Sequence, residues 1–163
     1  MPRIIPPTIS GGIMSRIQLI RIDESNFLDA FDLKLKDGQE TFVSHPIRSL
    51  AQAYVYYHQC CPFGIYLDDS MIGYVMVLYD YDLNEYNIWH MMIDSAYQNK
   101  GYGQMALEQC LSYIRTKPFG SSGKVVLTCN QDNRNAMHLY HKFGFSETGN
   151  QDEDEIELTR IME

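Results

Sequence analysis

A glycine-containing loop between an apolar strand and a helix restricts the fold of this chain more than any other feature. The run from Trp89 to Ile93 predicts a strand, and residues 98–103 (Gln-Asn-Lys-Gly-Tyr-Gly) lead from it into a helix predicted over 101–116. Backbone N–H groups at a helix N-terminus attract anions, and glycine lets a phosphate approach the main chain. The loop therefore indicates a phosphate-bearing ligand, although a strand–helix turn without a ligand would have the same pattern.

Two common phosphate-binding motifs do not match this loop. A Walker A motif needs Gly-Lys-Ser/Thr after four intervening residues, whereas Lys100 precedes its glycine. The dinucleotide fingerprint needs a third glycine within a βαβ unit at the first strand of the chain. The ligand of this loop must therefore be of another class.

The remaining periodicity predicts alternating strands and helices in a single domain. Strands are expected at 17–22, 63–67, 71–79, 87–93, 124–129 and twice after 145, and helices at 26–36, 48–60, 101–116 and 133–143. This order predicts an α/β (α+β) fold, a mixed sheet with helices on both faces. Residues 1–14 contain three prolines and no periodicity, so we expect a flexible N-terminal leader followed by one domain over 15–163.

Composition argues against several classes of partner. A net charge of −8 disfavours nucleic acid, whose binding proteins need a basic face. No stretch approaches the ~20 apolar residues of a membrane helix, so we expect a cytoplasmic protein without a membrane partner. The four cysteines lack metal-ligand spacing, which predicts buried apolar side chains and no metal.

A second motif lies C-terminal to the glycine-containing loop. Residues 135–145 (Asn-Ala-Met-His-Leu-Tyr-His-Lys-Phe-Gly-Phe) predict an amphipathic helix ended by Gly144. Together with Ile93 to Gly103, this stretch resembles the motifs of the GNAT superfamily of N-acetyltransferases, and the order of elements from residue 15 to the C-terminus is similar as well. The resemblance implies a mixed, mostly antiparallel central sheet flanked by helices, and the use of acetyl-CoA.

The resemblance also implies site residues. The main chain of Met91, Met92 and Ile93 would hold the thioester arm, and Tyr140 would protonate the departing thiolate. The pyrophosphate would be bound by Gln98, Asn99, Lys100, Gly101, Tyr102, Gly103 and Gln104, and Asn130 and Asn135 would also touch the cofactor. Asn99 replaces a family glycine and Ser95 a family proline; asparagine tolerates left-handed backbone, so the loop should persist.

The acceptor amine must lose a proton before it attacks. A primary amine of pKa ~10.4 is almost entirely protonated at pH 7, so a base or a desolvating site is needed. Glu85, just ahead of the strand that precedes the loop, is the base expected by analogy with relatives, and His90 is the competing residue. A solvated charge and a structural histidine are the alternative interpretations of these two.

Within the superfamily the chain looks most like bacterial spermidine/spermine acetyltransferases, through stretches such as 39–43, 49–54, 62–66, 88–94 and 147–149. A polycation requires spaced carboxylates and aromatic faces. The expected substrate-binding residues are Asp32, Asp37, Glu40, Tyr79, Asp80, Glu85 and Trp89. Residues 152–155 (Asp-Glu-Asp-Glu) are interpreted as a solvated turn.

Two alternative functions and the oligomeric state remain open. The same chemistry on another amine, such as a protein N-terminus, a lysine or an aminoglycoside, fits the acidic clusters equally well. A non-catalytic acetyl-CoA-binding module is disfavoured because Tyr140 is present in register. Self-association into a homodimer is compatible with the resemblance, but nothing in the sequence determines it.

Overall fold

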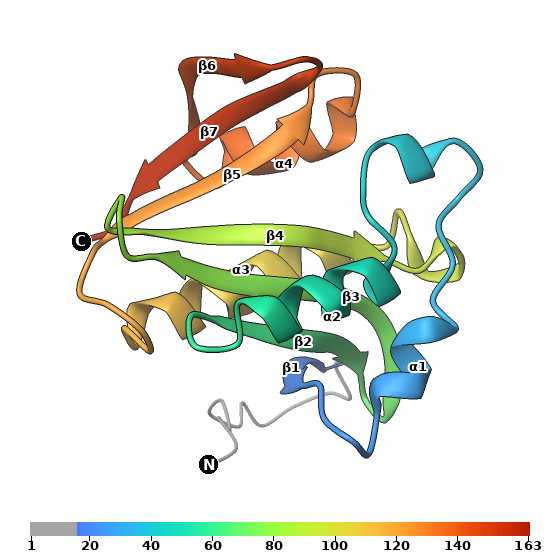
Figure 1. Ribbon diagram of the computed structural model, residues 1–163. Helices are drawn as coiled ribbons and strands as arrows, with labels where there is room; N and C mark the ends of the chain where they lie inside the picture. The colour runs from blue at the N-terminus through green and yellow to red at the C-terminus, as the bar shows by residue number, and fades with distance from the viewer. Residues whose placement is uncertain (1–15) are drawn as a thin grey trace, which may run out of the picture.

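A seven-stranded sheet forms the centre of the protein, with the order β1-β2-β3-β4-β5-β7-β6 (Figure 1). The computed structural model describes residues 16–163, so the predicted leader lies outside the described residues. Its strands are β1 (Ile17–Arg21), β2 (Cys60–Leu67), β3 (Ser70–Asp80), β4 (Glu85–Ile93), β5 (Lys124–Asn130), β6 (Ser146–Asp152) and β7 (Glu155–Ile161). β4 and β5 pair in parallel and the other neighbours are antiparallel, which confirms the predicted mixed, mostly antiparallel sheet.

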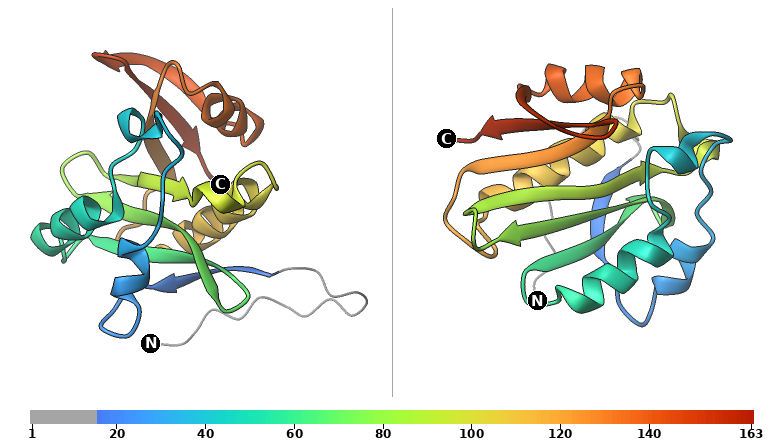
Figure 2. Two further views of the ribbon diagram at one scale, coloured as in Figure 1. Left: turned by 90° about the vertical axis from the view of Figure 1, so that its right-hand side faces the viewer. Right: turned by 45° about the horizontal axis from the view of Figure 1, so that its top comes forward.

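Helices cover both faces of this sheet, as predicted (Figure 2). One face carries α1 (Phe27–Phe31) and α2 (Pro46–Val55), and the other carries α3 (Tyr102–Arg115) and α4 (Arg134–Lys142). Two short 3-10 helices, η1 (Gln39–Thr41) and η2 (Ser95–Tyr97), lie in the connections. No helix among residues 16–163 is long and apolar enough to cross a membrane.

The alternation of side chains along β3 supplies both layers with a core. Val75 and Val77 belong to the larger cluster, which also contains Leu107 and Leu111 of α3. Tyr74, Met76 and Leu78 point to the opposite face and belong to the smaller cluster, with Ala30 and Ala53 of α1 and α2. These side chains are at most 7% exposed, because a strand buried on both faces has no solvent side.

Two predicted helices are shorter than expected. α1 ends at Phe31, because the following segment is tied to the chain beyond β4: Lys34 N donates to Asp94 Oδ2 at 2.8 Å, and Ser95 N donates to Lys34 O at 2.8 Å. α2 begins at Pro46 and ends at Val55, and β2 begins at Cys60, three residues earlier than predicted. Cys60 pairs with Leu78, so a buried sheet ladder replaces the last helical turn that the periodicity suggested.

β4 contains an irregularity that opens the sheet. Met76 pairs with Trp89 and Tyr74 pairs with Met92, so β4 has one residue more than β3 between these two pairs. This β-bulge includes His90, which has a φ of 56°. β4 and β5 pair only at Tyr86–Val125 and Asn87–Val126, and beyond these positions the two strands diverge (Figure 1).

Candidate active site

The space between the diverging strands contains two adjoining cavities. The loop cavity, about 210 Å³, is bounded by residues 98–103 and by α4. The bulge cavity, about 420 Å³, is bounded by Trp89 and His90 of the bulge and by the end of β5. Both are lined by Phe42, Val43, Met91, Asn133, Ala136 and Tyr140. Ligands bound in the two cavities would therefore both contact Met91 and Tyr140.

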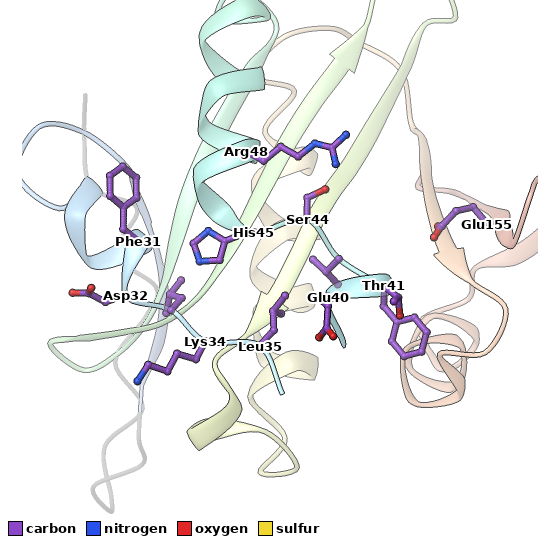
Figure 3. A pocket seen from close by; sticks show the side chains of 13 residues that line it. Phe31, Asp32, Lys34, Leu35, Glu40, Thr41, Ser44, His45, Arg48 and Glu155 are labelled. Carbon is purple, nitrogen blue, oxygen red and sulfur yellow. The ribbon is translucent and has the colours of Figure 1, made fainter. Parts of the chain in front are cut away.

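A third, wider cavity leads outward from the bulge cavity. This outer cavity, about 1100 Å³, lies between α1, the η1 segment and α2 (Figure 3) and shares Phe42, Val43, Ser44 and Glu155 with the bulge cavity. Its charged lining is mixed, with Asp32, Glu40 and Glu155 beside Lys34, His45 and Arg48. The outer cavity thus offers a second ligand a route to Tyr140 that does not pass through the loop cavity.

The loop at 98–103 adopts the conformation that an anion-binding helix N-terminus needs. Asn99 and Gly101 are left-handed, with φ values of 60° and 84°, and no side chain caps α3. Gln98 Nε2 donates to Ile93 O at 2.9 Å, which holds the loop against the end of β4. A Cβ at Gly103 would meet nothing nearer than Leu139 Cδ2 at 3.9 Å, so the space beside this glycine is open. The loop cavity therefore fits a ligand whose phosphates approach the first turn of α3.

The predicted cofactor residues are largely brought together here. The loop cavity is lined by Met91, Met92, Ile93, Gln98, Asn99, Gly101, Tyr102, Gly103, Asn135 and Tyr140. Asn130 lines the bulge cavity instead. Lys100 and Gln104 line neither cavity: Lys100 Nζ lies 5.9 Å from the Tyr97 ring centroid, and Gln104 Oε1 accepts a hydrogen bond from Lys142 Nζ at 2.8 Å.

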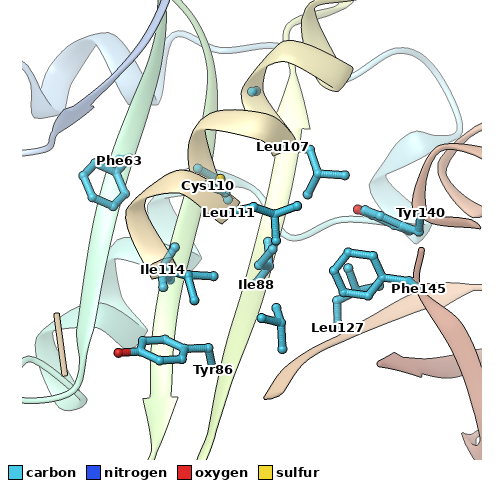
Figure 4. Close-up of a cluster of buried hydrophobic side chains, with 14 of the residues drawn as sticks. Phe63, Tyr86, Ile88, Leu107, Cys110, Leu111, Ile114, Leu127, Tyr140 and Phe145 are labelled. Carbon is cyan, nitrogen blue, oxygen red and sulfur yellow. The ribbon is translucent and has the colours of Figure 1, made fainter. Parts of the chain in front are cut away.

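Tyr140 projects from α4 toward the junction of the two cavities. Asn133 caps this helix by accepting from Ala136 N at 3.3 Å, and Gly144 turns the chain with a φ of 80°. The ring packs among buried apolar side chains, with its centroid 6.0 Å from that of Phe145 (Figure 4). Burial raises the pKa of Tyr140, so the phenol keeps its proton at neutral pH. No hydrogen bond joins its hydroxyl to another residue of the described chain, which leaves the proton free for a ligand.

His90 is held by a buried chain of hydroxyl groups. Its Nδ1 shares a hydrogen bond of 2.6 Å with Ser49 Oγ, which also donates to the Tyr74 hydroxyl oxygen at 2.8 Å. Burial, assisted by the positive charge of Arg48, lowers the pKa of His90 to about 4. The imidazole is consequently neutral at pH 7 and places no positive charge in the bulge cavity.

Comparison with known proteins agrees with this geometry. The model of the acetyltransferase (GNAT) family matches residues 27–145. The chain belongs to the GNAT family. It is therefore an N-acetyltransferase, an acyltransferase that uses acetyl-CoA as its acetyl donor. The open first turn of α3 and the left-handed loop are the features of this acetyltransferase that suit such a donor.

Several relatives resemble the acetyltransferase along most of its length. The spermine/spermidine N(1)-acetyltransferase of Bacillus subtilis (strain 168) is 25% identical over 142 residues, covering 83% of this chain and 91% of the relative. The spermidine N-acetyltransferase of Vibrio cholerae, solved with CoA and spermine, has a TM-score of 0.72 at 18% identity, covering 89% and 95% of the two chains. The ribosomal L7/L12 alpha-N-protein acetyltransferase RimL, solved with CoA, has a TM-score of 0.73 at 17% identity, covering 93% and 97%.

The structure does not bring Glu85 to these cavities. Glu85 begins β4, whereas Ile93 ends it next to the loop, and eight residues of strand span roughly 26 Å. The Glu85 side chain is buried and forms an ion pair with Lys124, whose Nζ lies 2.7 Å from Glu85 Oε2. Tyr79 and Asp80, which were also expected to bind the substrate, lie at the same end. The Tyr79 hydroxyl donates to Asn84 Oδ1 at 3.0 Å, and Asp80 accepts from the turn that follows it. The polar groups at this end of β4 are therefore paired within the fold.

The other predicted substrate residues are divided. Trp89 lines the bulge cavity, and Asp32 and Glu40 line the outer cavity, but Asp37 lines none of the three cavities.

The sequence analysis missed Glu155, which was placed in a solvated turn. The residue is half-buried at the start of β7 and lines both the bulge and outer cavities. The available signal was its place at the start of a strand after three exposed acidic residues; its pairing with Asn130 of β5 is visible only in the fold.

Proposed function

We propose that this acetyltransferase transfers the acetyl group of acetyl-CoA to a primary amine of a polyamine such as spermidine, by direct attack, with Tyr140 protonating the thiolate that leaves. The observation that carries the proposal is that Tyr140 lines both the loop and the bulge cavity, while its hydroxyl has no hydrogen-bond partner among residues 16–163. The thiol that forms, of pKa ~8.5, is a stronger acid than a phenol, and burial raises the pKa of Tyr140 further, so the proton transfer depends on its coupling to cleavage of the C–S bond and on the return of a proton from the new amide nitrogen.

The chain's own residues divide the binding work between the two cavities. In this proposal Met91, Met92 and Ile93 orient the thioester arm with their main chain, and residues 98–103 bind the phosphates at the first turn of α3. Acetyl-CoA, when bound, supplies the activated acetyl thioester. Asn135 lines the loop cavity beside them, Asn130 lines the bulge cavity, and Lys100 and Gln104 lie outside both; the bulge cavity is left for the acceptor.

The bulge cavity suits an amine for electrostatic reasons. Keeping a primary amine neutral at pH 7 costs about 4–5 kcal/mol when its pKa is ~10.4. The neutral His90 adds no repulsion to that cost, and Trp89 offers an aromatic face to a cation. Asp32 and Glu40 in the outer cavity would attract the remaining charges of a polyamine. The Bacillus and Vibrio relatives are named for spermine and spermidine, which belong to the same class.

One observation favours a different acceptor. The outer cavity also carries Lys34 and Arg48, which would repel a pure polycation but would bind the carboxylates of a peptide. A protein N-terminus is therefore the second candidate, and the fold likeness to RimL is compatible with it.

The deciding experiment is thiol release from acetyl-CoA with spermidine, spermine, an aminoglycoside, a lysine peptide and a peptide with a free N-terminus. We expect polyamine-dependent release by the wild type, and a fall of tenfold or more in kcat for Tyr140→Phe with its acetyl-CoA affinity kept, because the substitution removes only the hydroxyl. Release with the peptide alone would replace the polyamine by the second candidate. Equal kcat in Tyr140→Phe would remove the proposed acid.

A further inference from the structure

We propose that Glu155 binds the reacting ammonium group of the acceptor and takes up its proton, while Gln52 Oε1 accepts a hydrogen bond from an N–H of the same acceptor. This inference rests on the proposed acetylation of an amine, but it does not require that the amine be a polyamine. It assigns the base that the position of Glu85 leaves unassigned, and it adds a binding contact on α2.

The position of Glu155 carries the first half of the proposal. Among the residues that line the bulge cavity, Glu155 is the one carboxylate, and Tyr140 lines the same cavity. Glu155 pairs with Asn130 across the end of the β5–β7 ladder, where β5 has diverged from β4. In Figure 3 its carboxylate points from β7 toward the side of the outer cavity formed by Ser44 and Arg48. Any acceptor that passes from the outer to the bulge cavity meets this carboxylate.

The surroundings of Glu155 make it a stronger base than an exposed glutamate. Burial raises the pKa of Glu155, and the charge of Asp154 raises it further, while a hydrogen bond from Thr128 acts in the opposite direction. Tyr140 of α4 and Cys129 of β5, both protonated because burial raises their pKa values, face the carboxylate from the two neighbouring elements. His90 of β4 is neutral, which leaves Arg48 of α2 as the cation nearest the passage.

Gln52 carries the second half of the proposal. Its Oε1 is the one buried side-chain oxygen or nitrogen among residues 16–163 that lacks a hydrogen-bond partner, and Gln52 lines the bulge cavity. A buried acceptor left unpaired is destabilising and rare in native proteins, so Gln52 Oε1 is a candidate partner for a donor that the acceptor brings. An amine is a hydrogen-bond donor, and a protonated amine has up to three N–H groups, enough for Glu155 and Gln52 together.

The proton balance closes with these residues. Glu155 takes one proton from the ammonium group, and the neutral nitrogen attacks the thioester carbonyl carbon. As the C–N bond forms and the C–S bond breaks, Tyr140 donates its proton to sulfur and regains one from the amide nitrogen. Glu155 then releases its proton to water, so that one proton is liberated for each amide formed.

The test compares Glu155→Gln with Glu153→Gln, a matched change at an exposed position two residues away. The acceptor is the amine that the wild type turns over in the panel above. For Glu155→Gln we expect kcat/KM for the amine to fall about 100-fold at pH 7 and to recover with rising pH, because the neutral fraction of a free amine rises tenfold per pH unit below its pKa. The Kd for acetyl-CoA should change by less than twofold, and Glu153→Gln should match the wild type throughout.

An unchanged kcat/KM in Glu155→Gln, or a loss equal at every pH, would overturn the role of Glu155 as proton acceptor. A wild type inactive toward every amine would instead overturn the proposed function, so the two failures are distinguishable.

Gln52→Met separates binding from proton transfer. Methionine keeps the volume and removes the acceptor, so we expect KM for the amine to rise five- to tenfold with kcat within twofold, and a melting temperature no lower than that of the wild type because an unpaired buried oxygen is removed. An unchanged KM, or a melting temperature several degrees lower, would show that Gln52 serves the fold instead.

Discussion

The two ends of β4 lie in the same strand and serve opposite purposes. At its start, Glu85 is buried against Lys124, and Tyr86 and Asn87 pair with β5, so the sheet is closed. At its end, the bulge at His90 and the loss of pairing to β5 leave backbone and side chains facing cavities. The first end contains a carboxylate that is satisfied by a partner. The second contains a phenol and an amide oxygen that have none.

This contrast separates a polar group that serves the fold from the groups that we propose for function. Buried polar atoms are normally paired, and the pair at Glu85 obeys that rule. Gln52 and Tyr140 both line the bulge cavity, and among residues 16–163 neither Gln52 Oε1 nor the Tyr140 hydroxyl has a hydrogen-bond partner. For locating the site, the lack of a hydrogen-bond partner is therefore a better criterion than an acidic side chain close in sequence to the cofactor loop.

Glu85→Gln should produce the largest effect on the closed end. The substitution removes the charge that pairs with Lys124 inside a region where Glu85 is 5% exposed, so we expect a loss of about 2 kcal/mol in the free energy of unfolding. Because this end is far from both cavities, kcat and KM should stay within twofold of the wild type. Urea denaturation and the thiol-release assay measure the two quantities.

Glu147→Gln is the matched control, since Glu147 lies 3.6 Å from His141 Nε2 in an exposed pair. It should cost less than about 0.5 kcal/mol. A tenfold loss of kcat in Glu85→Gln with stability retained would reverse the comparison and return Glu85 to the site.

Gly103→Ala should affect the open end without harming the fold. The added Cβ has ordinary contacts with Leu139 and Ile93, and alanine is the better helix residue by about 1 kcal/mol, so thermal stability should hold or rise. Leu139 and Ile93 line the loop cavity together with Gly103, so the methyl group lies beside the place where phosphates approach the main chain, and we expect Kd for acetyl-CoA to rise about threefold. Calorimetric titration with CoA measures this. Tight binding by the variant would mean that the phosphates do not approach α3 here.

His90→Asn should weaken the dependence of stability on pH. The pKa of His90 is lowered from 6.5 to about 4 in the fold, so the unfolded chain binds a proton in this interval that the native protein refuses. Stability contributed by neutral His90 is therefore complete above pH 6.5 and lost as the pH falls toward 4. Asparagine tolerates the φ of 56° and does not titrate, so its melting temperature should decline less steeply over this interval. Parallel slopes for variant and wild type would contradict the buried, neutral assignment.

The bounds of α3, α4, β3 and β5 agree with the sequence prediction within one or two residues, because each has a strong local pattern and a clear end such as Gly144. α1 and α2 were extended too far, since long-range ties at Asp94 and Leu78 override local helical periodicity. The acceptor side was hardest to predict. Its residues come from α2, the bulge of β4 and the start of β7, which no sequence spacing connects.

The sequence by itself determined the family, the acetyl donor and the cofactor loop, because these depend on contiguous residues: a strand end, a helix N-terminus and the glycines between them. Only the tertiary structure decided which of two carboxylates lines the cavity that we propose for the acceptor. Glu85 and Glu155 are both acidic residues at the start of a strand, yet the parallel pairing of β4 with β5 buries the first beside Lys124, and the divergence of the same two strands leaves the second facing the cavity that contains Tyr140.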